Sequence, residues 1–316
     1  HRDLHSCPTR RSSDLDLLIT ITYNDDCRFK EWVDHYQEYK DELYLHIIVD
    51  NNSSENYQRL LKESFPDSVI IELGYNGGCT AAYNAGIKYA LENPQVDAIS
   101  LMGNDIKVPT GNMTKLYDFL MSTPNYSFVY PIILHPGEPD GIAWEYGQTY
   151  DKQKMQPYAI IRNSKISDLP EFLIAESGPG GCNLAKRSFY EINGLQDEKM
   201  FMYSDEMDTA IRAAKNGLVF ATTKNIFAWH LHINEPGKKQ RNPMSAYLMA
   251  RNHIYLARKH FGRKTMLKTF GKEFKKSLHS LILSIYKGDC KEGIKYSWNM
   301  LKGSFAGLFN NMKNDF

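Results

Sequence analysis

The stretch Ala98-Ile99-Ser100-Leu101-Met102-Gly103-Asn104-Asp105 decides how the rest of the chain is interpreted. Its apolar first half has the length and β-branched content of a strand that is buried on both faces. Asp105 follows the end of this strand. Ligands bind at the carboxyl ends of strands in a parallel α/β sheet, so Asp105 is predicted to meet a substrate or a hard cation there. A plain turn after the strand explains the same polar residues equally well.

Three strand-and-helix units precede this strand. The hydrophobic pattern predicts strands at residues 16–22, 43–49 and 69–72, and helices at 28–40, 55–65 and 80–92. Strands that alternate with helices favour a parallel sheet with right-handed crossover connections. The first hundred residues are therefore predicted to form a parallel sheet flanked by helices, in an α/β fold.

A polar loop follows each of the first three strands. The loops contain Thr22-Tyr23-Asn24, Asp50-Asn51-Asn52 and Asn76-Gly77-Gly78. Each one alone is ordinary turn chemistry, but their recurrence at one edge of the sheet indicates a shared crevice. Asp50 can accept hydrogen bonds from a ribose or a base, and Gly77-Gly78 leads into a helix N-terminus that suits an oxygen-rich ligand. No G-x-G-x-x-G or G-x-x-x-x-G-K-[ST] motif is present, which argues against dinucleotide-dehydrogenase and P-loop classes.

The bulk composition excludes some classes of protein. The chain has 316 residues, of which 42% are hydrophobic and 24% charged, and a formal net charge of +1, which argues against a general nucleic-acid binder. No apolar run approaches the roughly 20 residues of a membrane span. The five cysteines form no Cys-x-x-Cys pair, which is typical of a reduced, cytoplasmic chain. Residues 1–15 lack periodicity and are interpreted as a non-native or disordered tail, outside the fold.

The second half of the chain carries further candidate site residues. A glycine-rich segment, Gly178-Pro179-Gly180-Gly181, would let the backbone approach a sugar closely. Ser204 is a candidate N-cap for a helix that starts with Asp205, Glu206 and Asp208, and these acids are explained either by the helix dipole or by a general base. Other candidates are histidines on one strand face (His230, His232), a cationic loop (Lys238, Lys239, Arg241), and aromatic residues that suit sugar faces or core packing (Trp144, Tyr146, Tyr150, Tyr158).

In their order along residues 16–260, these motifs resemble the inverting glycosyltransferases of family 2, which have the GT-A nucleotide-diphospho-sugar transferase fold, and rhamnosyltransferase-like members in particular. The resemblance also rests on Ala82-Tyr83-Asn84-Ala85-Gly86, Leu101 to Asp105, Gly180 to Asn183, Gly194 to Glu198, Phe201 to Arg212, His230 and Arg251-Asn252. It implies a nucleotide-diphosphate sugar donor and a divalent cation, Mg²⁺ or Mn²⁺, held by Asp105 with His230. The implied donor-binding residues are Thr22, Tyr23, Asn24, Asp50, Asn52, Asn76, Gly77, Asn84, Asn104 and Gly181.

Two positions depart from the family pattern. The acidic motif usually begins with Asp or Asn, where this chain has Gly103, so metal binding is expected to rest on Asp105 with outer-sphere help from Asn104. The family's Glu-Asp-x-Asp motif is reversed here to Asp205-Glu206. The family pattern places the base at the second position, so Glu206 is expected to deprotonate the acceptor and Asp205 to play a structural part.

Residues 261–316 form a basic tail with 11 Lys and Arg against four Asp and Glu. Phe270, Phe274, Leu278, Leu281 and Ile285 recur at helical spacing and give it an apolar stripe. Two interpretations remain open: an amphipathic helix on an anionic membrane, at the inner face of the cell membrane, or a helix packed on the catalytic domain.

The sequence thus predicts a metal-dependent glycosyltransferase that moves rhamnose or a hexose to a hydroxyl of a cell-surface glycan or glycolipid. The alternatives are a sugar-1-phosphate nucleotidyltransferase and an inactive sugar-nucleotide-binding scaffold. The first would need a basic glycine-rich loop after the first strand, where this chain has the acidic Asp25-Asp26. Gly103 is the feature that favours the second.

Overall fold

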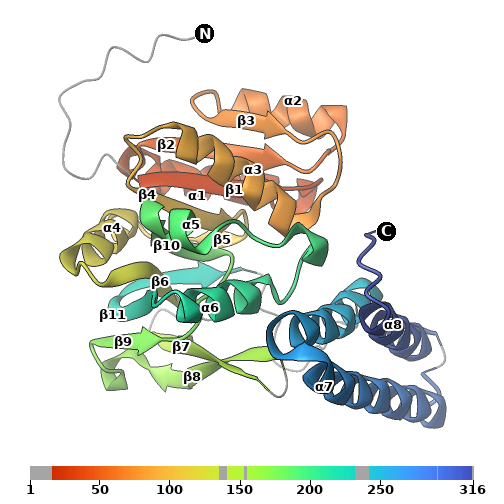
Figure 1. Ribbon diagram of the computed structural model, residues 1–316. Helices are drawn as coiled ribbons and strands as arrows, with labels where there is room; N and C mark the ends of the chain where they lie inside the picture. The colour runs from red at the N-terminus through yellow and green to blue at the C-terminus, as the bar shows by residue number, and fades with distance from the viewer. Residues whose placement is uncertain (1–15, 135–140, 153–154, 232–241, 290, 315–316) are drawn as a thin grey trace.

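The N-terminal half is a parallel β-sheet with a helix after each strand but the last (Figure 1). The computed structural model describes residues 16–134, 141–152, 155–231, 242–289 and 291–314. The elements in chain order are β1 (Asp16–Thr22), α1 (Asp26–Tyr39), β2 (Leu45–Asp50), α2 (Glu55–Ser64), β3 (Val69–Glu72), α3 (Gly78–Glu92) and β4 (Ala98–Gly103). The predicted strands and helices are confirmed, with boundaries that differ by three residues or fewer.

The register of this sheet places the polar loops together. The strands lie in the order β3-β2-β1-β4, all parallel, with Thr22 paired to Asp50 and Asp50 paired to Glu72. Both faces are buried, because Leu17 and Ile19 pack on one side of β1 and Leu18 packs on the other. The carboxyl ends of β1, β2 and β4 therefore meet at one edge, as predicted.

The second half completes the sheet with strands of both directions. The further strands are β5 (Ile106–Lys107), β6 (Tyr126–Leu134), β7 (Ile142–Asp151), β8 (Gln156–Lys165), β9 (Phe172–Ala175), β10 (Cys182–Lys186) and β11 (Val219–His230). β10 runs antiparallel to both β4 and β6, whereas β11 runs parallel to β6. The prediction of a mostly parallel sheet therefore holds for β1 to β4, while the whole sheet is mixed. β7 and β8 are consecutive in the sequence and antiparallel, as a short connection allows, whereas β10 follows β4 and β6 only after several intervening elements.

Helices cover both faces of the sheet and continue into a C-terminal appendage. The remaining helices are α4 (Asn112–Ser122), α5 (Arg187–Asn193), α6 (Asp205–Lys215), α7 (Pro243–Tyr286) and α8 (Glu292–Leu308). α7 is interrupted at Gly262, whose φ of 81° and ψ of 178° are not helical, and this break coincides with the predicted start of the tail at residue 261. Figure 1 shows the distal part of α7 beside α8, away from the sheet. Among the described residues, no helix has the length and apolar character needed to cross a membrane.

The appendage packs closely on the helix that precedes it. The face of α8 toward α7 carries small buried residues: Gly293, Ser297, Gly303, Ser304 and Gly307. A Cβ at Gly303 would lie 2.1 Å from the Tyr247 carbonyl oxygen, and one at Gly307 would lie 2.6 Å from the Arg251 carbonyl oxygen. The helix backbones are therefore in direct contact, and the tail does not hang free of the catalytic domain.

This contact gives a matched pair of substitutions. Gly303→Ala forces a methyl group into the Tyr247 backbone and is expected to lower the free energy of unfolding by about 1–3 kcal/mol. Gly271→Ala lies in α7 with nothing within 4 Å of the new methyl group, so it should raise stability by up to about 1 kcal/mol. Urea denaturation of both variants measures the difference. Equal stability of the two variants would contradict the close packing of α8 on α7.

Candidate active site

A cavity of about 440 Å³ opens at the carboxyl edge of the sheet. It lies where β4, β5 and β11 meet the N-terminus of α6, and α7 closes one side of it. Its lining includes Asp105, Trp144, Glu145, Gln148, Gln156, Gly180, Gly181, Tyr203, Ser204, Glu206, His230, Met249 and His253. The predicted base and the predicted metal ligands thus share one cavity, which we call the reaction cavity.

Asp105 and His230 are brought together although they lie far apart in the sequence. His230 Nε2 lies 3.0 Å from Asp105 Oδ2, and the Leu231 N–H donates to the Asp105 carbonyl oxygen. The pairing of β11 with β5 fixes this arrangement, since His230 lies opposite Ile106. A Cβ at Gly103 would lie 2.5 Å from Asp105 Oδ1. The glycine that departs from the family pattern therefore leaves room for the Asp105 carboxylate.

This pair fits a divalent cation with few protein ligands. The Asp105 side chain is 14% exposed and that of His230 35%, so both are accessible at the rim. No cluster of three or more His, Cys, Asp and Glu side chains suited to a metal occurs within the described ranges. A cation here would take its remaining ligands from phosphate oxygens and water, as Mg²⁺ and Mn²⁺ commonly do.

Asp25 and Arg28 join this site, and the sequence analysis missed them. Arg28 Nε donates to Asp25 Oδ2 over 2.9 Å, and Asn104 Nδ2 donates to the same oxygen over 2.8 Å. Burial opposes ionisation of Asp25, but these hydrogen bonds hold its pKa below the usual range. Burial lowers the pKa of the Arg28 guanidinium, but its hydrogen bond to Asp25 and the charges of Asp25 and Asp105 raise it above the usual range. Asn104 is thus engaged with Asp25, where the sequence predicted a donor contact. The i, i+3 spacing of Asp25 and Arg28 was the available signal.

The three predicted nucleotide loops are tied to one another. Asn24 Oδ1 accepts from the Ser54 N–H, and the Asn24 N–H donates to Ser53 Oγ. Asn51 Oδ1 accepts from the Gly77 N–H. Tyr23 is half exposed at the mouth of these loops. The three loops therefore form one continuous rim, as the sequence predicted.

Several of the predicted donor-binding side chains form hydrogen bonds within the protein. Asp50 is fully buried and accepts from the Ser53 N–H and from Gln58 Nε2, while Thr22 Oγ1 bonds to the Tyr57 hydroxyl. Asn84 is buried as well, and both ends of its amide are bonded to residues 196–198. These three side chains hold the loops in place through bonds within the protein. Tyr23, Asn24, Asn52, Asn76 and Gly77 lie at the surface of the rim, and the donor-binding roles of the whole set remain predictions.

The glycine-rich segment shapes the other side of the reaction cavity. The Gly103 N–H donates to the Gly181 carbonyl oxygen over 2.8 Å, which joins this segment to the end of β4. A Cβ at Gly180 would lie 2.8 Å from Glu206 Oε1. Asn183 Nδ2 donates to the carbonyl oxygens of Pro179 and Gly180 and fixes the turn. Glycine at position 180 therefore makes space for the Glu206 carboxylate.

The segment directly before α6 has a strained backbone and positions Glu206 in the cavity. Phe201, Tyr203 and Ser204 all have positive φ values, between 64° and 68°, which non-glycine residues rarely adopt. The Asn252 amide donates to the carbonyl oxygens of Met200, Met202 and Tyr203 and holds this segment. Ser204 occupies the N-cap position of α6, but its side chain accepts no capping hydrogen bond, so that part of the prediction is wrong.

Arg251 supports the same segment from the next position of α7. It is fully buried and donates to the Met200 carbonyl oxygen over 3.0 Å. Its guanidinium also donates to the Lys313 carbonyl oxygen and to Asn314 Oδ1 at the C-terminal end of the described chain. Arg251 and Asn252 together therefore hold the backbone of the segment that leads into α6. No role for these two residues was predicted from the sequence.

Asp205 and Glu206 occupy different environments. Asp205 is 6% exposed and lies against a smaller cavity behind α6, where burial and the neighbouring Glu206 charge raise its pKa well above the usual range. Glu206 is half-buried, lines the reaction cavity, and has its pKa raised by burial. A raised pKa suits a general base that works near neutral pH.

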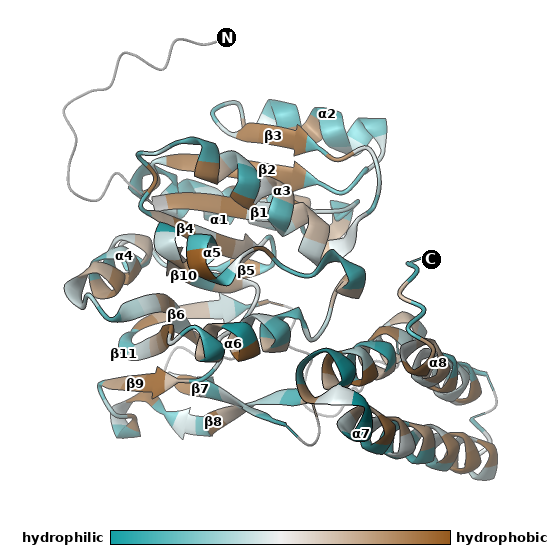
Figure 2. Ribbon diagram, viewed as in Figure 1, coloured by the Kyte–Doolittle hydropathy of each residue, from teal (hydrophilic) through white to brown (hydrophobic). Residues whose placement is uncertain are grey.

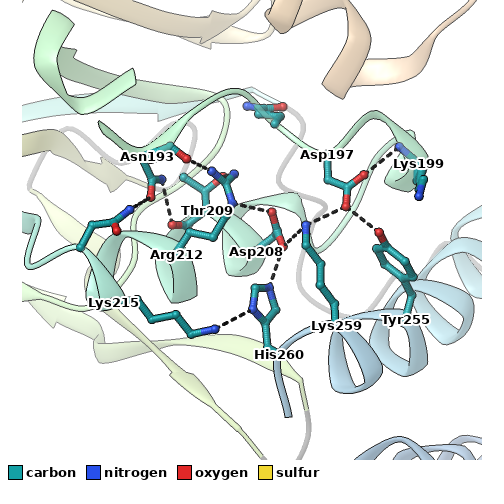
Figure 3. A network of polar contacts seen from close by, with 12 residues as sticks. Asn193, Asp197, Lys199, Asp208, Thr209, Arg212, Lys215, Tyr255, Lys259 and His260 are labelled. Carbon is teal, nitrogen blue, oxygen red and sulfur yellow. Dashed lines mark hydrogen bonds and ion pairs between the residues drawn. The ribbon is translucent and has the colours of Figure 1, made fainter. Parts of the chain in front are cut away.

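Beside this site, a polar network locks α6 to α7 (Figure 3). Lys259 Nζ lies 2.7 Å from both Asp208 Oδ1 and Asp197 Oδ2, and His260 Nε2 lies 2.7 Å from Asp208 Oδ1. Arg212 pairs with Asp208 across one turn of α6, as predicted. Burial opposes ionisation of Asp208, but the His260 hydrogen bond and the Lys259 and Arg212 charges hold its pKa far below the usual range. The third acid of the motif is structural.

The remaining predicted residues divide between the site and the core. Trp144 lines the reaction cavity, whereas Tyr146 is buried and its hydroxyl donates to the Pro170 carbonyl oxygen. Tyr158 is exposed on β8. The predictions for His232 and for the cationic loop of Lys238, Lys239 and Arg241 lie outside the described residues.

Comparison with known proteins decides the family. Residues 17–191, more than half of the chain, match the family described as Glycosyl transferase family 2. The chain belongs to this family. It is a glycosyltransferase, which agrees with the fold and with the shared edge of polar loops.

Two curated relatives are glycosyltransferases. This family 2 chain is 25% identical over 221 residues to the low-salt glycan biosynthesis hexosyltransferase Agl10 of Haloferax volcanii, covering 69% of the chain and 68% of the relative. It is 23% identical over 242 residues to the N-acetylglucosaminyl-diphospho-decaprenol L-rhamnosyltransferase of Mycobacterium tuberculosis, covering 68% and 75%. The relatives thus include a hexosyltransferase and a rhamnosyltransferase.

Solved structures share the fold at low sequence identity. GalNAc-T7 with UDP, GalNAc and Mn²⁺ matches with a TM-score of 0.61 and 13% identity, over 92% of this chain and 56% of that longer one. The mannosyltransferase PcManGT of Pyrobaculum calidifontis, with GDP-Man and Mn²⁺, matches with a TM-score of 0.52 and 14% identity, over 94% and 87%. The predicted GT-A fold is confirmed.

The Asp208 network predicts a dependence of stability on pH. Because the folded-state pKa of Asp208 is depressed, its stabilising contribution is present above the unfolded value of about 3.9 and is lost as pH falls below it. Asp208→Asn is expected to lower the free energy of unfolding at pH 7 by about 3 kcal/mol and to flatten its decline at acid pH. Urea denaturation between pH 7 and pH 3 measures both effects.

The control for this prediction is Asp34→Asn. Asp34 forms an exposed ion pair with Lys30 on α1, and such pairs contribute at most about 1 kcal/mol. If Asp208→Asn and Asp34→Asn had the same pH profile as the unmodified protein, the network would not stabilise the fold.

Proposed function

We propose that this chain transfers a sugar with inversion from a nucleotide-diphosphate donor to a hydroxyl of a lipid-linked or cell-surface glycan. The observation that carries the proposal is that Glu206 and the Asp105–His230 pair line one cavity beside the rim of nucleotide loops. Such an arrangement places a proton acceptor and a cation site in the walls of one cavity. In-line displacement needs both groups near the sugar, because the attacking hydroxyl and the leaving diphosphate lie on opposite sides of the anomeric carbon.

The roles of the residues follow from their chemistry. Glu206 accepts the proton of the acceptor hydroxyl as that oxygen attacks the anomeric carbon. Asp105 and His230 would hold Mg²⁺ or Mn²⁺, which when bound neutralises the charge of the leaving diphosphate. Arg28 lies beside Asp105 and can contact a phosphate oxygen through its remaining N–H groups. Gly180 and Gly181 let the sugar approach the backbone.

The donor is proposed to be dTDP-rhamnose or a UDP-hexose. The relatives transfer a hexose or L-rhamnose, and the fold neighbours hold UDP or GDP-Man with Mn²⁺. Tyr23 is placed to stack on the base, with Asn24, Asn52, Asn76 and Gly77 around it. Incubation with a panel of nucleotide sugars, read by released nucleotide with and without Mn²⁺, tests the proposal. A protein that binds donors and releases no nucleotide with any acceptor would be the inactive scaffold instead.

The distribution of apolar and polar side chains on the C-terminal helices supports a lipid-linked acceptor. On distal α7 the buried positions are largely polar or small (Thr269, Glu273, Ser277, Ser284), whereas Leu267, Leu278, Ile282, Leu283, Ile285 and Tyr286 are exposed. On α8 the buried positions are glycine and serine with Met300, and Trp298, Phe305 and Phe309 are exposed. Figure 2 shows apolar segments along the outer surface of both helices. Apolar side chains thus face outward from a tightly packed helix pair, which is typical of contact with lipid.

The charge of the appendage points to an anionic membrane as the partner. Exposed lysines, including Lys268, Lys272, Lys275, Lys287, Lys295 and Lys302, flank the apolar positions. A basic and aromatic surface of this kind binds anionic lipid headgroups while its apolar side chains enter the interface. We propose that the protein lies peripherally at the inner face of the cell membrane, with the reaction cavity supplied from the lipid side.

The metal site is tested by Asp105→Ala. Loss of the carboxylate is expected to reduce Mn²⁺-dependent nucleotide release on the order of 10²-fold or more, because a rim carboxylate stabilises charge in the transition state and contributes little to packing. Calorimetric titration with Mn²⁺ measures binding directly. Asp34→Ala, which removes an exposed carboxylate elsewhere on α1, is the control. Full activity of Asp105→Ala would overturn the metal assignment.

The base is tested by a pair of neutralising substitutions. Glu206→Gln is expected to lose transfer on the order of 10²-fold or more and to retain donor binding, since the base contacts the acceptor. Asp205→Asn should lose less, because Asp205 is buried behind α6 and holds its proton. Transfer rates and calorimetric donor binding decide between them. If Asp205→Asn were inactive and Glu206→Gln active, the roles of the two acids would be reversed.

The membrane surface is tested without truncation, since α8 is part of the packing around Arg251. The triple variant Ile282→Asn, Ile285→Asn and Phe309→Asn changes only exposed side chains. We expect about tenfold weaker co-sedimentation with phosphatidylglycerol-containing vesicles and little change in donor hydrolysis. Ile174→Asn, at an exposed apolar position on β9, is the control. Equal binding of the unmodified protein to neutral and anionic vesicles would refute the proposed partner.

A further inference from the structure

His253 is a buried histidine in the wall of the reaction cavity that the proposed chemistry leaves without a role. It lies on the first part of α7, one turn after Met249, and both residues line the cavity. Its side chain is 1% exposed. Nδ1 lies 2.9 Å from Glu273 Oε1, and Nε2 has no hydrogen-bond partner among the described residues.

Glu273 fixes both the orientation and the tautomer of this ring. The Glu273 side chain is 8% exposed, and Lys276 Nζ lies 3.9 Å from its other oxygen. Burial opposes ionisation of Glu273, but the His253 hydrogen bond and charge hold its pKa below the usual range. An ionised carboxylate can only accept, so Nδ1 carries the hydrogen. Nε2 lies on the ring edge opposite Glu273 and can bond a hydroxyl, as an acceptor in the neutral ring or as a donor in the charged one.

We infer that His253 Nε2 forms a hydrogen bond with a hydroxyl of the acceptor sugar and thereby determines which acceptor is used. The inference rests on the proposed function and extends it to the acceptor side of the site. His253 lines the cavity, its ring is fixed through Nδ1, and Nε2 is left to bond a ligand that enters the cavity.

The position of His253 favours the acceptor over the donor. Its neighbour Asn252 holds the segment before α6, and Glu206 begins that helix, so His253 and the base are positioned by the same anchor. The nucleotide loops after β1 and β2 do not contribute to the cavity lining. Sugars carry several hydroxyl groups, and a second contact beside the base would orient the one that attacks. A site built to bond a hydroxyl discriminates against analogues that lack it.

This assignment makes the appendage part of the active site. Glu273 lies beyond the break at Gly262, on the segment that also carries the proposed membrane surface. An acceptor delivered from a lipid surface would therefore meet a histidine that is held by the membrane-facing helix. The Arg251 guanidinium bonds to Lys313 and Asn314, which follow α8, and to Lys199 and Met200, which precede α6, and so joins these two segments.

The test compares acceptor and donor kinetics in His253→Gln. The probe is N-acetylglucosaminyl diphosphate with a short alkyl chain, chosen from the acceptor named for the mycobacterial relative. We expect the KM for this probe to rise about tenfold or more, with the donor KM and the hydrolysis of donor by water unchanged. Glu273→Gln, whose amide permits either tautomer, should give a smaller rise. His279→Gln, exposed on the same helix, is the control.

A structural role would give a different result. Long-range ¹H–¹⁵N spectra of histidine-labelled protein should show an Nδ1–H tautomer that is missing in His253→Gln, and its Nε2 signal should move on addition of the probe. An unchanged probe KM in a folded His253→Gln variant, or a rise in the donor KM alone, overturns the inference while leaving the proposed function intact. If the unmodified protein neither binds nor uses the probe, both the acceptor class and this inference fail.

Discussion

The hydrogen bonds from the Asn252 amide to the segment before α6 are the interaction on which the active site depends. That segment contains three non-glycine residues with positive φ, a conformation that costs of the order of 1–3 kcal/mol for each residue. Asn252 and Arg251 offset this cost by donating hydrogen bonds to four carbonyl oxygens of the segment, those of Lys199, Met200, Met202 and Tyr203. The Phe201 carbonyl oxygen accepts from the Thr80 N–H of α3. Glu206, the proposed base, is thus held between the sheet domain and the C-terminal helices.

One consequence is that the C-terminal helices cannot be regarded as an accessory to the catalytic domain. α8 contacts the backbone of α7 at Tyr247 and Arg251, directly before Asn252. The same helix pair is apolar on the outside and rich in serine and glycine on the inside. The same helix pair therefore has two proposed functions. Its outer face suits a lipid surface, and its inner face supports the residues that position the proposed base and close the cavity.

At the proposed cation site, packing explains why the chain departs from the family pattern at Gly103. At the end of β4 the first acidic position is Gly103, and a side chain there would collide with the Asp105 carboxylate in its present orientation. His230 reaches Asp105 from the last residue of β11, and Arg28 and Asp25 approach from α1. The carboxylate is therefore surrounded by groups from three separate parts of the chain. One acid with this support offers a cation less charge than two acids would, and it leaves more coordination positions for the diphosphate.

The sequence by itself determined the parallel part of the sheet and the edge at which the site lies, because short continuous apolar runs and polar strand ends are local signals. It also proposed Asp105, His230 and Glu206 as members of one candidate site, and the structure brings all three to one cavity. It did not reveal the internal bonds of other polar residues: Asp50 bonds to Ser53 and Gln58, Thr22 to Tyr57, and Asn84 to Glu198. The mixed direction of the remaining strands, the clamp at Asn252 and the pairing of His253 with Glu273 were decided only by the tertiary structure. Each of these depends on contacts between residues 20 or more positions apart, for which the spacing along the chain carries no signal.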